Sequence, residues 1–97
     1  MSEELQAEVF RADMARQLLE NQLLRDALTA IETEVVTMWG AAPARDKEGK
    51  EALWQLYKTS QKFRGLLLGY IETGKMATAD LAHIEKQSRL RSLFRAA

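Results

Sequence analysis

Apolar side chains recur every three or four residues in the first part of the chain, which is the spacing of one helix face. A loose stripe predicts a helix over 3–19 and a more regular stripe predicts a helix over 22–39. The stripes consist of Leu5, Val9, Met14 and Leu18, followed by Leu24, Ala27, Leu28, Ile31, Val35 and Met38. Asn21 lies between them and is favoured immediately before a helix, because its side chain can accept a hydrogen bond from a free backbone N–H. We therefore expect a break or bend at Asn21, with one continuous helix as the alternative.

The segment "WGAAPARD" contains the signals that end one helix and begin the next. Gly40 is placed to end the second helix in a left-handed conformation, and Pro43 prevents easy continuation. Asp46 is suited to cap the N-terminus of a third helix. We therefore expect a connecting loop between the second helix and the third.

The third helix is expected over 47–73, where Gly74 ends it with Lys75 just beyond. Thr78 or Asp80 would then cap a last helix over 79–94. This last helix carries the apolar residues Leu81, Ile84, Leu90, Leu93 and Phe94. No stretch alternates with period two, so we predict no strand.

These elements define an all-α chain with one domain over residues 1–97. A third helix of about 27 residues would be ~40 Å long, whereas a compact globule of this length has a radius of gyration of only ~13 Å. We therefore predict an elongated antiparallel helical hairpin with an additional N-terminal helix and a C-terminal helix. A chain of 97 residues without cysteine buries a limited core and has no disulfide, so oligomerisation is the expected further source of stability.

The segment "RGLLLGYI" in the third helix is apolar on more sides than a two-helix hairpin buries. The shorter second helix cannot cover this end of the third helix. Glycines four residues apart lack side chains and allow a second helix backbone to approach closely. We predict self-association through this segment, at Gly65, Leu66, Leu68, Gly69 and Tyr70. The alternative is that the terminal helices cover it within one chain.

Charge is unevenly distributed although the net charge is zero. The chain carries eight acidic and three basic residues up to Gly40, and six acidic and eleven basic residues after it. The end of the chain is basic, with Lys86, Arg89, Arg91 and Arg95. These residues could contact a protein partner, including the acidic first half of a neighbouring subunit, or the phosphates of a nucleic acid. The remaining possibility is a solvated face.

No combination of residues predicts catalysis, a metal site or a cofactor. His83 and Glu85 lie two residues apart and point to different sides of a helix, so they cannot share a metal ion. The antiparallel turn would bring Trp39 and Trp54 together, which favours core packing near the loop, with an exposed partner-binding patch as the alternative. The longest apolar run is "LLL", so no membrane span is expected.

Three segments, "LLENQLLRDAL", "PARDKEGKEALWQL" and "IETGKMA", resemble a group of short uncharacterised all-helical proteins of tailed bacteriophages and prophages. In that group a helix opens after an Asn, a loop similar to "TPxRDxEGRExLW" begins the long helix, and a Gly-Lys pair ends it. The resemblance covers about Arg16–Ala77. The chain differs in having Gln22 where a proline is common and "AAP" in place of a Thr-Pro step.

The resemblance implies a phage origin, a place among virion assembly genes, and a location in the host cytoplasm or the virion. It implies no activity and supplies no catalytic residues. Together with the residue patterns, it favours a non-enzymatic structural or assembly protein that self-associates through its long helix and contacts other phage or host proteins. The alternatives are a small nucleic-acid-binding or packaging accessory that uses the basic C-terminus, and a host-directed inhibitor of a bacterial protein.

Overall fold

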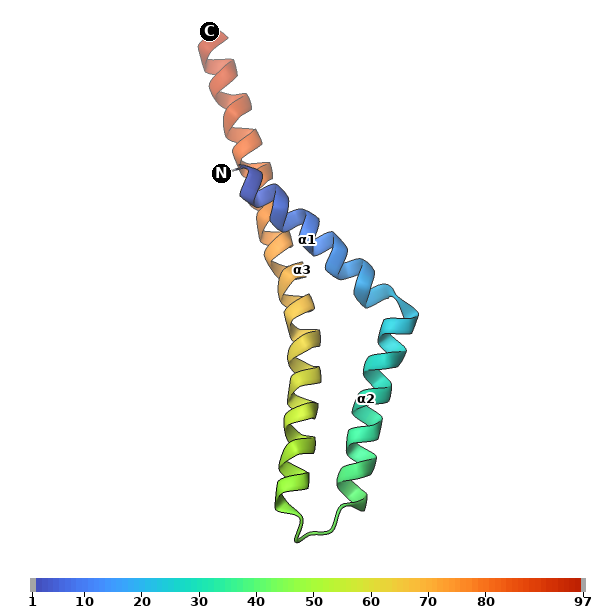
Figure 1. The fold of residues 1–97 in the computed structure, drawn as a ribbon. Helices are drawn as coiled ribbons and strands as arrows, with labels where there is room; N and C mark the ends of the chain where they lie inside the picture. The colour runs from blue at the N-terminus through green and yellow to red at the C-terminus, as the bar shows by residue number, and fades with distance from the viewer. Residues whose placement is uncertain (1, 97) are drawn as a thin grey trace. The chain divides into compact units, whose positions relative to one another are not determined.

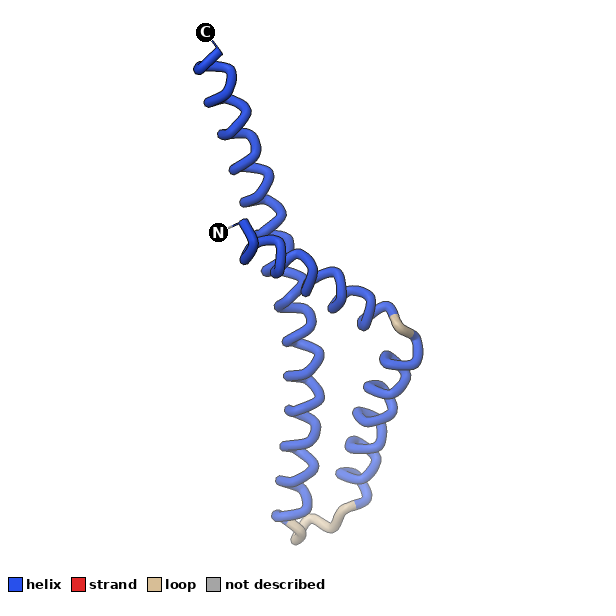
Figure 2. Tube along the Cα trace, turned by 45° about the horizontal axis from the view of Figure 1, so that its top comes forward, coloured by secondary structure: helices blue, strands red, loops and turns tan. Residues whose placement is uncertain are grey.

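The structure, a computed structural model, describes residues 2–96, with side chains for residues 3–95. This part of the chain forms three helices and no strand (Figure 1, Figure 2). The helices are α1 (Ser2–Glu20), α2 (Gln22–Ala41) and α3 (Lys47–Ala96). The predicted all-α class is confirmed, while the elongated hairpin and its oligomerisation stay predictions.

The helices belong to two compact units. One unit joins α1 up to Arg16 with α3 from Leu68 onward, and the other comprises Gln17–Leu67. Because α3 contributes to both units, the single domain over 1–97 also stays a prediction.

Asn21 separates α1 from α2, as the sequence predicts. Its backbone is extended, and its side-chain Oδ1 accepts a hydrogen bond from the Leu24 backbone N–H at 3.1 Å. Asp46 caps α3 in the same way, because its Oδ1 accepts from the Gly49 N–H at 3.0 Å. Both caps satisfy a backbone donor that the first helical turn leaves free.

The end of α2 differs from the prediction. Gly40 lies inside the helix, which continues to Ala41, and no described residue adopts a positive φ. Ala42 is extended and its N–H donates to the Met38 carbonyl at 2.9 Å. Pro43 explains this ending, because a proline disfavours helical geometry in the residue before it. The helix therefore stops without a left-handed glycine.

The predicted helices over 47–73 and 79–94 are a single helix, because α3 runs without interruption to Ala96. The prediction that Gly74 ends a helix is wrong. Gly74 is buried, and a Cβ added there would overlap the Cβ of Ala12 and lie 3.3 Å from the Glu8 carbonyl oxygen. Glycine at this position allows α1 to approach α3 closely.

The expected caps of the last helix are also wrong. Thr78 and Asp80 lie in the interior of α3. The Thr78 hydroxyl donates to the Gly74 carbonyl oxygen at 2.9 Å, which is the back-bonding of a threonine inside a helix. Neither residue begins a helix.

In the Gln17–Leu67 unit, α2 and the N-terminal part of α3 lie side by side in opposite directions (Figure 1). The buried residues of this unit are Leu28, Val35, Ser60 and Leu67. Glu32 of α2 accepts hydrogen bonds from Arg64 at 3.0 Å and from Gln61 at 3.4 Å. A short apolar seam and one polar cluster therefore hold the two helices together.

In the other unit, α1 crosses α3 (Figure 1, Figure 2). The contact is made by small residues: Ala12, Ala15 and Ala77 are buried, together with Gly74. Small side chains at a crossing reduce the distance between helix axes, which increases backbone packing but buries little apolar area.

Candidate interaction surfaces

The C-terminal part of α3 extends beyond its contact with α1 (Figure 1). Ala77 is buried and Leu81 is half-buried, but every residue over 82–95 is exposed. This stretch includes large apolar residues, among them Leu93 and Phe94, and Phe94 is 79% exposed. This described stretch is therefore not polar on all sides, because it carries a strip of apolar side chains that is exposed to solvent.

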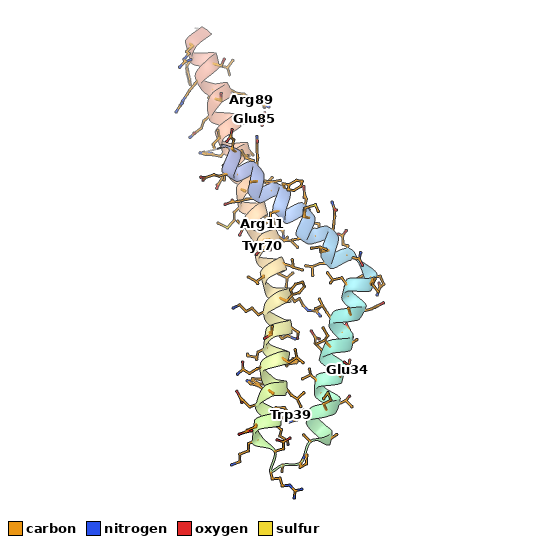
Figure 3. The ribbon with its side chains drawn as sticks, in the orientation of Figure 1. Arg11, Glu34, Trp39, Tyr70, Glu85 and Arg89 are labelled. Atoms are coloured by element: carbon orange, nitrogen blue, oxygen red, sulfur yellow. The ribbon has the colours of Figure 1, made fainter. Side chains whose placement is uncertain are left out.

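The four predicted basic contact residues all lie on this stretch. Arg89 is hydrogen-bonded to Glu85 one turn earlier (Figure 3). Lys86, Arg91 and Arg95 have no described carboxylate within ion-pair distance. These three charges are free to meet an anionic partner.

The predicted self-association residues differ in their surroundings. In the Gln17–Leu67 unit, Leu66 is exposed, and no atom beyond the adjacent helical backbone lies within 4 Å of a Cβ placed on Gly65. In the other unit, Leu68 is exposed, and the space beside Gly69 is equally open. Backbone is thus accessible at both glycines.

Tyr70, the fifth residue of that prediction, has a partner within its own unit. The Arg11 guanidinium of α1 lies 4.3 Å from the centre of its ring (Figure 3). Such a cation–π contact contributes about 0.5–1 kcal/mol at an exposed site. Tyr70 is half-buried and is therefore less available to a second molecule than Leu68.

Sequence reasoning missed the small-residue crossing of α1 and α3. Ala12 and Ala15 are three residues apart, as are Gly74 and Ala77. Small residues at this spacing share one face of a helix and permit close packing. These two matching spacings were the sequence feature that could have indicated the crossing. The incorrect prediction of a helix end at Gly74 prevented this interpretation.

Trp39 of α2 and Trp54 of α3 line one apolar hollow near the connecting loop, with a volume of about 200 Å³. Tyr57 completes the α3 side and stacks with Trp54. The two tryptophan residues are 40% and 44% exposed, so the core-packing interpretation is wrong. The tryptophans instead form an accessible aromatic surface.

Two lysines border this hollow. The Lys50 ammonium lies 5.4 Å from the centre of the Trp39 ring, and the Lys58 ammonium lies 5.2 Å from that of Trp54. Each indole therefore has a cation beside it, within the range of a cation–π interaction.

The described residues contain no group of three or more His, Asp or Glu side chains arranged to hold a metal ion. His83 interacts with Gln87 at 3.1 Å, while Glu85 contacts Arg89, so these side chains are directed to different neighbours. Among the described helices, none is both long enough and apolar enough to cross a membrane.

Comparison of the chain with protein-family models, with curated proteins and with solved structures finds no match.

Proposed function

We propose that this chain is a non-enzymatic helical interaction protein that self-associates through α3 and serves as a structural or assembly component of a bacteriophage. The phage assignment rests on the sequence resemblance over Arg16–Ala77. The interaction role rests on one observation, the imbalance between buried and exposed apolar side chains.

Six apolar residues are buried in the described part of the chain, and three of them are alanine. No large side chain there is fully buried, while eighteen large hydrophobic residues are exposed. Single exposed apolar side chains are normal, but extended sets mark interaction surfaces. A small chain with so little core gains most from burying these surfaces against another molecule.

The predicted segment Gly65, Leu66, Leu68, Gly69 and Tyr70 is the proposed site of self-association in an elongated helical hairpin. Gly74 supports this role, because it is the glycine of α3 against which Ala12 already packs. Gly65 and Gly69 have open space where Gly74 has a neighbouring helix. An α-helix from another copy can approach at these glycines for the same steric reason.

The test is the molar mass in solution, measured by light scattering over a range of micromolar concentrations. We expect a mass above the 11.0 kDa of one chain. Gly65→Leu and Gly69→Leu should each weaken association by about ten-fold, because the added side chain blocks backbone approach. Gly40→Leu is the matched control, since Gly40 is also a helical glycine facing open space.

A wild-type mass of 11.0 kDa throughout that range would contradict self-association. If Gly40→Leu weakens the oligomer as much as Gly69→Leu does, the proposal that the chain self-associates still stands. The segment from Gly65 to Tyr70 is then excluded as the site of that association.

A nucleic-acid accessory is the second candidate, and the exposed cations Lys86, Arg91 and Arg95 favour it. Binding through these residues would fall steeply with salt, because phosphate contacts release counterions. A gel shift that is unchanged when Arg89, Arg91 and Arg95 become alanine would exclude the C-terminal segment as the contact.

A further inference from the structure

We propose that residues 82–95 of α3 dock antiparallel on the outer face of α1 in a second copy of this chain. The outer face is the side of α1 that carries Phe10 and Met14. This proposal rests on the self-association proposed above and adds a second, separately testable contact to it.

The docking segment lacks a partner in its own chain. Residues 82–95 are all exposed, so this end of α3 lacks the packing of an apolar face that supplies most helical stability in proteins. Leu93 and Phe94 lie three and four residues after Leu90, so the three side chains share one side of the helix. Covering this strip would remove apolar surface from water and stabilise the helix.

The receiving face is also bare. Phe10 is 67% exposed, and Met14, one turn later on the same side, is exposed as well. Ala12 and Ala15 occupy roughly the opposite side of α1, where both are buried and Ala12 packs against Gly74 of α3. The helix α1 therefore has two apolar sides, and its own chain uses the one with small residues.

The two surfaces have opposite charge. Residues 2–16 contain four acidic and two basic side chains, whereas residues 82–95 contain one acidic and four basic side chains. Opposite charges steer association and favour the correct partner. The acids of α1 are concentrated in its first turn, at Glu3 and Glu4.

Charge and helix dipoles select the antiparallel orientation. With Leu90 opposite Phe10, it places Arg95, near the end of α3, beside Glu4 in the first turn of α1, with Arg91 one turn closer to Phe10. It also sets the negative C-terminal end of one helix dipole beside the positive N-terminal end of the other. A parallel arrangement would separate the basic end from the acidic turn.

The occupant is a second copy because the segment cannot fold back on its own α1. No glycine or proline follows Gly74 in the sequence, and α3 is helical without interruption to Ala96. Reaching the outer face of its own α1 would require a sharp reversal, and helices kink sharply at proline, glycine or an inserted group.

A charge-swap experiment tests this contact. The first variant carries Arg91→Glu and Arg95→Glu, and the second carries Glu3→Lys and Glu4→Lys. Each variant alone places like charges together, so its self-association should weaken at least about ten-fold. An equimolar mixture restores opposite charges at both contacts of a reciprocal dimer and should associate within about three-fold of wild type.

Sedimentation velocity measures the association, and far-ultraviolet circular dichroism verifies that each variant remains helical. The control is Arg45→Glu with Lys47→Glu, two exposed bases of the other unit with no described ion-pair partner. This control should leave association unchanged.

The outcomes separate the two proposals. A wild-type chain that stays monomeric overturns both self-association and this contact. A wild-type oligomer that neither charge variant weakens, or a mixture that fails to associate better than its components, overturns this contact alone. Recovery in the mixture supports it.

A second measurement does not depend on charge. Leu90→Ala and Phe94→Ala remove side chains that are exposed in the single chain, so intramolecular packing is not lost. Each should weaken self-association by about ten-fold, as truncation of a buried interface anchor does. Leu23→Ala, which truncates an exposed leucine of α2, should have no effect, and equal effects of all three variants would count against the contact.

Discussion

Gly74 of α3 packs directly against Ala12 of α1, so closely that a Cβ on the glycine would overlap the alanine side chain. The Glu8 carbonyl oxygen would also lie only 3.3 Å from that Cβ. Both atoms belong to parts of α1 that cannot rotate away as a long flexible side chain can. The contact therefore fixes how near the two helices of this unit lie.

Gly74→Ala is expected to destabilise the fold, whereas Gly69→Ala is expected to stabilise it. Both changes improve helix propensity by up to about 1 kcal/mol. At Gly69 the new methyl group enters open space, but at Gly74 it meets Ala12, and overpacking costs about 1–3 kcal/mol. Urea unfolding followed by circular dichroism, at a protein concentration low enough for the chain to be monomeric, measures both free energies of unfolding. A stabilising Gly74→Ala would show that the close contact is not formed.

Asn21→Ala should lower the free energy of unfolding by about 0.5–2 kcal/mol, because the Leu24 N–H loses its side-chain acceptor. Asn21→Asp keeps an acceptor at the same position and is the control, with stability near wild type. The same urea unfolding measurement applies. If alanine proves as stable as aspartate, the cap does not contribute.

The ion pair between Glu32 and Arg64 joins α2 to α3 at 3.0 Å and is partly shielded from solvent. A double-mutant cycle with Glu32→Ala and Arg64→Ala should give a coupling energy of about 0.5–1 kcal/mol, which decreases in 1 M salt. The exposed pair of Lys75 and Glu72 within α3 provides the comparison, with a coupling of about 0.2–0.5 kcal/mol. A coupling no larger than that of the exposed pair would contradict a stabilising role for the inter-helix contact.

The sequence was sufficient to predict a structural feature where the residues that cause the feature are close together in the chain. Asn21 and Asp46 cap helices through backbone groups three residues away, and these contacts need nothing from the rest of the chain. Pro43 likewise acts on its immediate neighbour, although it ends α2 through extended Ala42 and not through a left-handed Gly40. Local chemistry thus predicted where the helices begin more reliably than how they end.

Gly74 shows why contacts between segments that are distant in the sequence were not predicted. Judged from its neighbours in sequence, Gly74 resembles a helix end, but Ala12 of α1, which lies 62 residues earlier, makes it a packing contact inside a helix. The basic residues of the candidate surface were found because charge is visible in sequence. The exposure of these basic residues depends on where along α3 the contact with α1 ends.

The two tryptophans should be accessible to quenchers and should respond more strongly to an anion than to a cation. Trp39 and Trp54 are the only tryptophans, and each is bordered by a lysine ammonium, from Lys50 and Lys58 respectively. Iodide should therefore be concentrated near the indoles and caesium repelled, so the ratio of the Stern–Volmer constants for iodide and caesium should exceed the ratio for free N-acetyltryptophanamide at low ionic strength.

Lys50→Gln with Lys58→Gln should reduce this difference, because the local positive charge is removed while side-chain length is largely kept. Lys62→Gln, an exposed lysine that does not lie over either indole, is the control and should leave the ratio unchanged. Neutral acrylamide reports accessibility alone and should quench wild type and variants equally. Weak quenching by acrylamide in a chain shown to be monomeric would mean that the indoles are enclosed within one molecule. Weak quenching only in the oligomer would instead place the aromatic surface at a contact between copies, because association would then be what removes it from solvent.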